Sequence, residues 1–155
     1  MRMWRLLAAG VGAIALVACA PALPSLPATT APLAPSATGD SALTRSDDQG
    51  TVSVAVTPLN LDPTSVTLDF SVDLSTHTVD LSWDLASQAT LSTDTGLQVA
   101  GASWPVGSGH HVEGTLSFPA HTADGRALLE GARTLTLTLR DTDVAERTFV
   151  WDLAR

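Results

Sequence analysis

The chain is poor in several residue types that often stabilise a small domain or give it a function. It has one cysteine, Cys19, so no disulfide can form within one molecule. The only methionines are Met1 and Met3, which leaves the rest of the chain without a thioether ligand for cuprous ion. Lysine is absent, and eight arginines face sixteen carboxylates. A folded domain must therefore rely on its own core, and the chain lacks the clustered basic residues that nucleic-acid binding requires.

The first nineteen residues have the order of an export signal. Arg2 and Arg5 precede an apolar run from Leu6 to Ala18, which is short for a bilayer span. The run closes with Leu16-Val17-Ala18-Cys19, which resembles the lipobox of bacterial lipoproteins. In that family, cleavage before the cysteine makes it the lipidated first residue of the mature protein. The resemblance implies a signal peptide over residues 1–18, acyl chains such as palmitate on Cys19, and an extracytoplasmic location in the bacterial cell envelope.

Residues 19–50 predict a tether that starts at the lipidated cysteine. Five prolines, at positions 21, 24, 27, 32 and 35, lie among alanine, serine and threonine, and no apolar period is visible. Such a composition favours extended, solvated conformations, because it cannot bury enough apolar surface to offset the entropy of ordering. We therefore expect residues 19–50 to be a disordered linker between the membrane and a folded domain.

Residues 51–155 predict a single all-β domain. Apolar and polar residues alternate in runs of five to nine residues, at 52–56, 66–74, 79–85, 134–139 and 149–153. Each run has one apolar and one polar face, which is typical of antiparallel strands over a core. Further strands flank Asp94-Thr95-Gly96 and lie over 112–118. Seven or eight short strands predict a β-sandwich, with Trp83 and Trp151 in phase with its interior.

The order of these motifs resembles the immunoglobulin-like domains of uncharacterised bacterial surface lipoproteins. The matching features are the Asp94-Thr95-Gly96 hairpin, Ser103-Trp104-Pro105, the segment 109–119 and the final Leu-x-Leu strand at 135–139. The resemblance implies an immunoglobulin-like antiparallel sandwich over most of residues 51–155, without the cysteine pair of antibody domains. Fold similarity of this kind does not define a function.

The histidines offer the most specific ligand chemistry in the chain. His77, His110 and His111 lie in predicted turns and loops, and imidazole is a good ligand for zinc and cupric ions. Together with Asp80 or Glu113 they would supply three or four ligands, provided that the turn and the loop share one end of the sandwich. Loop histidines that make only structural hydrogen bonds are the alternative interpretation.

Catalytic motifs are incomplete. Asp94-Thr95-Gly96 matches the core of aspartic proteases, but two such loops are needed for paired carboxylates, and this turn also suits a hairpin. No Gly-x-Ser-x-Gly elbow occurs. The sequence therefore predicts a non-enzymatic protein, anchored in a membrane through Cys19, with a binding or structural module whose protein or glycan partner it does not name. A zinc-binding or copper-binding protein is the alternative.

Overall fold

The computed structural model describes residues 41–153. The expected signal peptide, Cys19 and residues 20–40 of the expected tether lie outside this range. In chain order the elements are η1 (Ser41–Leu43), β1 (Arg45–Asp47), β2 (Val52–Asn60), β3 (Thr67–Thr76), α1 (Leu85–Gln88), β4 (Ala89–Thr93), β5 (Gln98–Ala100), β6 (His111–Pro119), β7 (Thr134–Thr142) and β8 (Val144–Asp152).

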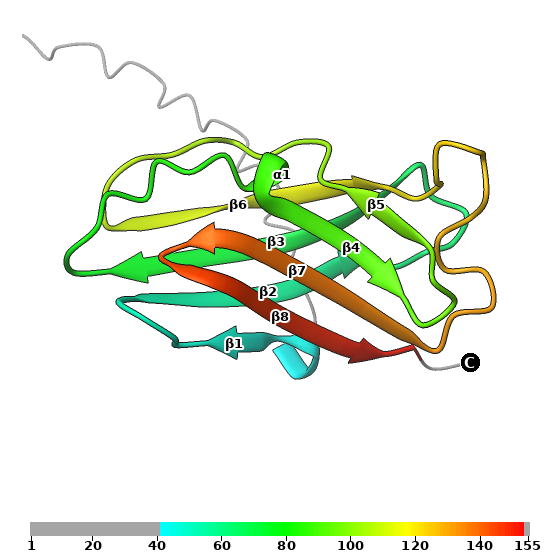
Figure 1. The fold of residues 1–155 in the computed structure, drawn as a ribbon, viewed down its shortest axis with the longest axis horizontal. Coiled ribbons are helices and arrows are strands. Elements are labelled where there is room, and N and C mark those ends of the chain that lie inside the picture. Colours follow the sequence, from blue (N-terminus) through cyan, green and yellow to red (C-terminus); the bar gives the residue numbers. More distant parts are fainter. Residues whose placement is uncertain (1–40, 154–155) are drawn as a thin grey trace, which may run out of the picture. The chain divides into compact units, whose positions relative to one another are not determined.

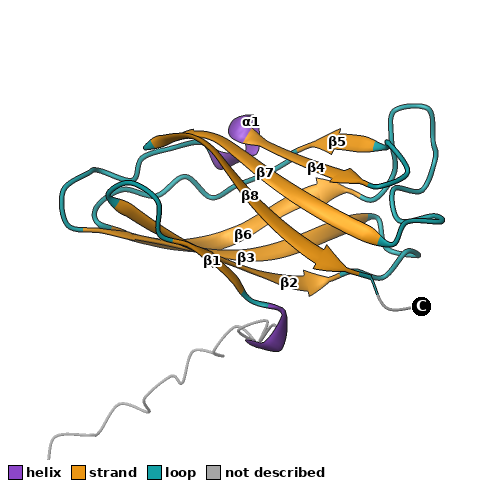
Figure 2. Ribbon diagram, turned by 60° about the horizontal axis from the view of Figure 1, so that its bottom comes forward, coloured by secondary structure: helices purple, strands orange, loops and turns teal. Residues whose placement is uncertain are grey.

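The eight strands form two antiparallel sheets that pack face to face (Figures 1 and 2). The first sheet has the order β1-β2-β3-β6 and the second the order β5-β4-β7-β8. In the first sheet, the neighbours β2, β3 and β6 follow the order of strands A, B and E of an immunoglobulin domain. In the second sheet, β4, β7 and β8 follow the order of its strands C, F and G. The predicted all-β sandwich is confirmed.

The core lies between the sheets and explains the alternating sequence. In β3, every second residue from Leu68 to Leu74 is buried, and the residues between them are partly exposed. The ring of Phe70 lies 5.7 Å from that of Phe118 and 5.4 Å from that of Trp151, so both sheets contribute to one aromatic group. Burial of each large apolar side chain is worth about 1.5–3 kcal/mol.

The strand predicted over residues 79–85 is not formed. This segment crosses from the first sheet to the second and then enters α1. Leu81 and Leu85 are buried, but the Leu81 N–H donates to the carbonyl of Gly109 in a loop, at 2.8 Å, and not to a neighbouring strand. Trp83, predicted to lie in the interior, is half-buried at the edge of the core. The alternation here reflects burial of a single extended crossing, without strand pairing.

The sandwich begins before the predicted boundary at residue 51. Strand β1 lies within the expected tether and pairs with β2, from Arg45 opposite Val56 to Asp47 opposite Val54. We call residues 43–51 the strap. Few of its side chains are apolar, and its backbone and polar groups make many of its contacts, so hydrophobic periodicity could not reveal it.

Candidate functional site

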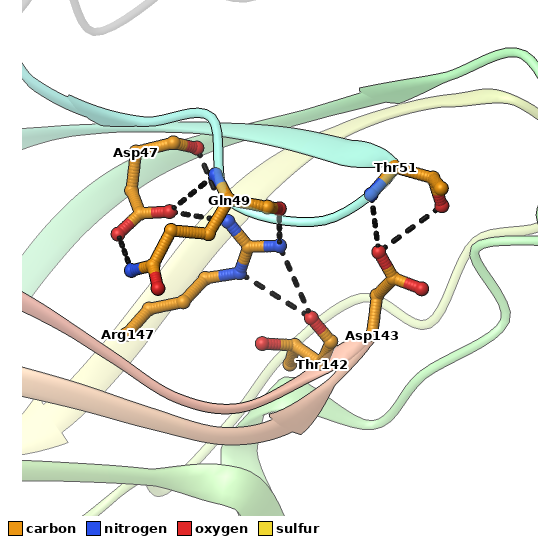
Figure 3. Close-up of polar contacts among 6 residues, drawn as sticks. All are labelled: Asp47, Gln49, Thr51, Thr142, Asp143 and Arg147. Atoms are coloured by element: carbon orange, nitrogen blue, oxygen red, sulfur yellow. Dashed lines mark hydrogen bonds and ion pairs between the residues drawn. The ribbon is translucent and has the colours of Figure 1, made fainter.

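The most unusual polar group in the described part of the chain is the side chain of Arg147 (Figure 3). It is fully buried, and it shares the inward face of β8 with Phe149 and Trp151. Its Nη1 donates to Asp47 Oδ1 at 2.6 Å and to the Asp47 carbonyl at 3.2 Å, while Nη2 donates to the Gln49 carbonyl at 2.7 Å. One guanidinium from β8 thus holds the strap at two successive points.

The β7–β8 turn completes the environment of this arginine. Both Nε and Nη2 of Arg147 donate to the Thr142 carbonyl at 3.3 Å. The planar guanidinium therefore meets one carboxylate and three backbone carbonyls, a donor pattern that lysine could not reproduce. We call Asp47, Gln49, Thr142 and Arg147 the arginine cluster.

The electrostatics of the cluster depend on Asp47. Burial alone would raise the pKa of the Asp47 carboxyl, but hydrogen bonds from the backbone and side chain of Gln49, together with the charge of Arg147, hold it below its ordinary value. The carboxylate therefore stays ionised at neutral pH. Desolvating two charges is costly, and removing one partner of a buried pair typically costs about 3–5 kcal/mol.

A second carboxylate fastens the end of the strap. Asp143 has a positive φ of 66° in the β7–β8 turn, and its Oδ2 accepts hydrogen bonds from the Thr51 N–H at 2.6 Å and the Thr51 hydroxyl at 3.0 Å. The Thr51 N–H holds the pKa of Asp143 below its usual value. The neighbouring Gly50 has a φ of 71°, and a Cβ there would collide with this carboxylate. The β1–β2 loop and the β7–β8 turn are therefore joined at one end of the sandwich, which we call the far end.

The beginning of the strap is held by different chemistry. The indole Nε1 of Trp151 donates to the Leu43 carbonyl at 2.6 Å, and Arg45 Nε donates to the Val150 carbonyl at 3.0 Å. We call this the near end, because the chain that precedes the sandwich enters it here. The strap is consequently held to β8 along its length, while β1 pairs with β2.

The far end also carries part of the predicted metal site. The Thr76 N–H donates to the His110 carbonyl at 2.9 Å, so the turn at His77 and the loop at His110 lie side by side. The Asp80 carboxylate accepts a hydrogen bond from the Gly109 N–H at 2.6 Å. The backbone therefore brings His77, Asp80 and His110 to one end of the sandwich, and the side chains of both histidines are exposed there.

The other two candidate ligands lie on the outer face of the first sheet. His111 Nδ1 is 3.7 Å from Asp73 Oδ1, and Glu113 is opposite Asp73 in the register of β3 and β6. Within residues 41–153, no group of three or more histidine, cysteine, aspartate or glutamate side chains could hold a metal ion. His110 and His111 thus belong to different surroundings although they are adjacent in sequence.

The turn at Asp94-Thr95-Gly96 has a structural role. Asp94 Oδ1 accepts hydrogen bonds from the backbone N–H groups of Arg133 at 2.9 Å and Thr134 at 3.2 Å. The same two N–H groups hold the pKa of Asp94 below its ordinary value. Gly96 has a φ of 82°, which suits a tight turn between β4 and β5. This carboxylate fixes the start of β7 beside a hairpin.

An apolar groove of about 370 Å³ lies at the near end. Its walls include Leu43, Leu61, Leu129, Trp151 and Leu153. Leu43 and Trp151 also carry the hydrogen bond that holds the start of the strap, so the groove borders the point where the chain enters the sandwich.

The arginine cluster was missed in the sequence, although one signal was present. Arg147 occupies an apolar phase position, two residues before Phe149 and four before Trp151. A charged residue on the inward side of a strand predicts a buried partner. Its partner, Asp47, lies a hundred residues away, in a segment whose composition favours a linker.

Comparison with models of protein families, with curated proteins and with solved structures found no match. Over residues 41–153, none of the helices has the length and apolar character needed to cross a membrane.

Proposed function

We propose that this protein is a lipid-anchored, extracytoplasmic lipoprotein of the bacterial cell envelope. The proposal rests on the Leu16-Val17-Ala18-Cys19 sequence after a short apolar run. Two or three acyl chains on Cys19 would hold the protein to a membrane far more firmly than one chain.

In this proposal the sandwich is a non-enzymatic binding or structural module, related to the immunoglobulin-like domains of bacterial surface lipoproteins. The way in which the chain enters the sandwich is in keeping with a tethered module. The strap is held against β8 by Arg147 and Trp151, so a tether from the membrane would end in a firm attachment. The far-end loops, at the opposite end of the sandwich from Leu43, would be available to a protein or glycan partner.

Replacement of the anchor residue tests the proposal. Cys19→Ala, expressed in a bacterium that processes lipoproteins, should abolish lipid attachment and leave uncleaved precursor or soluble exported protein, so its detergent partitioning should differ from that of wild type. Ser25→Ala, in the expected tether, is the matched control and should stay in the detergent phase. Mass spectrometry of the wild-type N-terminus should show acylated Cys19. Equal partitioning of Cys19→Ala and wild type would contradict the lipid anchor.

Zinc or cupric-ion binding remains the alternative function. The observation in its favour is the Thr76–His110 hydrogen bond, which places the turn at His77 beside the loop at His110. Because only neutral imidazole ligates a metal, binding would weaken as the pH falls through the histidine range. Calorimetry with zinc and cupric salts at neutral pH tests it, with a His77→Ala, His110→Ala double variant as the comparison. If the double variant still binds the metal, the metal site does not involve His77 and His110.

A further inference from the structure

The strap is antiparallel to a strand in each sheet. It pairs with β2 through backbone hydrogen bonds, from Arg45 opposite Val56 to Asp47 opposite Val54. Its contacts with β8 also run in opposite directions, since Leu43 meets Trp151 whereas Asp47 meets Arg147. Figure 1 shows β1 and β8 along the same edge of the sandwich. A strand of three residues is thus fixed to both layers at once.

The direction of a pull decides how these contacts would break. If the chain before Leu43 is pulled while the far end of the sandwich is held, the force acts along β1. The Trp151, Arg45 and Arg147 contacts are then strained together, in shear. If the C-terminus is held instead, the force acts at the near end alone, because Leu153 and Leu43 both line the groove there. The contacts then break one after another, beginning at Leu43.

We propose that the strap is a mechanical joint, which transmits a pull on the tether into both sheets through the arginine cluster and the Trp151–Leu43 hydrogen bond. The inference rests on the proposed lipid anchor, because such a pull must come from a membrane attached ahead of residue 43. A partner bound at the far end would hold the opposite side and create the shear geometry.

Buried charge suits this role. The fully buried guanidinium of Arg147 has Asp47 as its counterion, and the Asp47 side chain is 12% exposed. If the strap leaves, the guanidinium loses that partner and two backbone carbonyls in one event. Separation of the strap is therefore coupled to opening of the boundary between β1 and β8, and in the shear geometry the joint should hold until the sandwich itself unfolds.

Single-molecule pulling in two geometries tests the joint. The full chain, made by cell-free synthesis without membranes so that Cys19 stays a free thiol, offers a unique attachment point for one handle. A second thiol is placed either at the far end, as Ser108→Cys in an exposed loop, or after Arg155. We expect a higher rupture force with the far-end handle, and a single unfolding step. With the C-terminal handle, the strap should separate first and add about 30 Å of chain.

Variants connect the force to the named contacts. In the far-end geometry, Asp47→Ala and Trp151→Phe should each introduce an early step before the main unfolding event, because release of the nine-residue strap frees about 30 Å of chain. Arg140→Ala is the matched control, because Arg140 is an exposed arginine that pairs with Glu146, and it should keep the single step. If Asp47→Ala does not fold, Trp151→Phe carries the test, since it retains an aromatic ring in the core.

Equal rupture forces in the two geometries would overturn the joint, and so would a step pattern in Trp151→Phe that matches Arg140→Ala. The lipid anchor is judged separately by the partitioning of Cys19→Ala. If Cys19→Ala partitions as wild type does while the two pulling geometries still differ in rupture force, the joint stands and the membrane is excluded as the source of the pull.

Discussion

The sandwich has two long seams, where an edge strand of one sheet meets an edge strand of the other. At the first seam, the crossover that follows β5 lies against β6. The Ala102 N–H donates to the Ser117 carbonyl at 2.8 Å, and the Ser117 N–H donates to the Ser103 carbonyl at 3.1 Å. Trp104 then packs over Gly114. This seam is closed by backbone hydrogen bonds and apolar packing within about fifteen residues of chain.

The second seam is closed by the strap, from a hundred residues away in the sequence. Here a buried ion pair and side-chain donors to backbone carbonyls replace most of the backbone pairing. A seam closed by residues that are close in sequence needs only local backbone geometry, whereas a segment distant in sequence needs specific side-chain contacts to hold it. Loss of one such contact at the strap should therefore lower the free energy of unfolding more than loss of one contact at the crossover.

The largest expected effect is that of removing the strap. A chain of residues 51–155 loses β1, the counterion of Arg147 and the acceptor of the Trp151 indole. We expect its free energy of unfolding to fall by at least about 3 kcal/mol relative to residues 20–155, because a buried charge loses its partner. Urea denaturation followed by tryptophan fluorescence measures the difference. Equal free energies of unfolding for the two chains would mean that the strap contributes nothing to the stability of the sandwich.

Overpacking of the first seam should have a smaller effect. A Cβ at Gly114 would lie 2.7 Å from Pro105 Cγ and 3.0 Å from Trp104 Cζ3, so the crossover must move to accept a side chain. We expect Gly114→Val to cost about 1–3 kcal/mol. Thr115→Val, at the exposed neighbouring position of the same strand, is the control and should change the stability little. A Gly114→Val protein as stable as wild type would show that this seam is loosely packed.

The two seam tryptophans form a matched pair. The Trp151 N–H donates to the Leu43 carbonyl, whereas the Trp104 N–H is buried and has no partner among the residues that the structure describes. Trp151→Phe should therefore cost about 1–3 kcal/mol more than Trp104→Phe, because it leaves a carbonyl unpaired. Thermal or urea unfolding of both variants gives the comparison. A larger cost for Trp104→Phe would reverse our ranking of the seams.

Acid should weaken the strap through Asp47. The folded-state pKa of this carboxyl lies below its unfolded value of about 4, so its stabilisation is present above that value and is lost as the pH falls through the folded-state pKa. The stability advantage of wild type over Asp47→Asn should thus shrink between neutral pH and about pH 3. Urea titrations at several pH values measure it. A difference that stays constant with pH would exclude Asp47 as the titrating group.

The sequence predicted the sandwich because its strands alternate between apolar and polar residues. Runs such as Leu68 to Leu74 and Leu135 to Leu139 are buried at every second position, as their pattern indicated. The same rule failed over residues 79–85, since Leu81 and Leu85 are buried by a crossing that has no strand beside it. Hydrophobic periodicity reports burial directly, and it reports strand pairing only indirectly.

The arginine cluster could not be predicted in the same way. Arg147 was visible as a charge in an apolar phase, but nothing local pointed to Asp47, which lies in a polar segment rich in serine, threonine and aspartate. Pairing over a hundred residues depends on how the sheets close, which no short window contains. The histidines show a related limit, because the proximity of His77 and His110 follows from the β3–β6 pairing.

A double-variant cycle between Asp47 and Arg147 tests the central claim most directly, namely that β8 holds the strap through this pair. Asp47→Ala, Arg147→Met and the combined variant are compared with wild type by urea unfolding at neutral pH. We predict a coupling energy of about 1.5–3 kcal/mol, because either single change leaves a nearly buried charge without its partner. Effects that add within about 0.5 kcal/mol would contradict the claim.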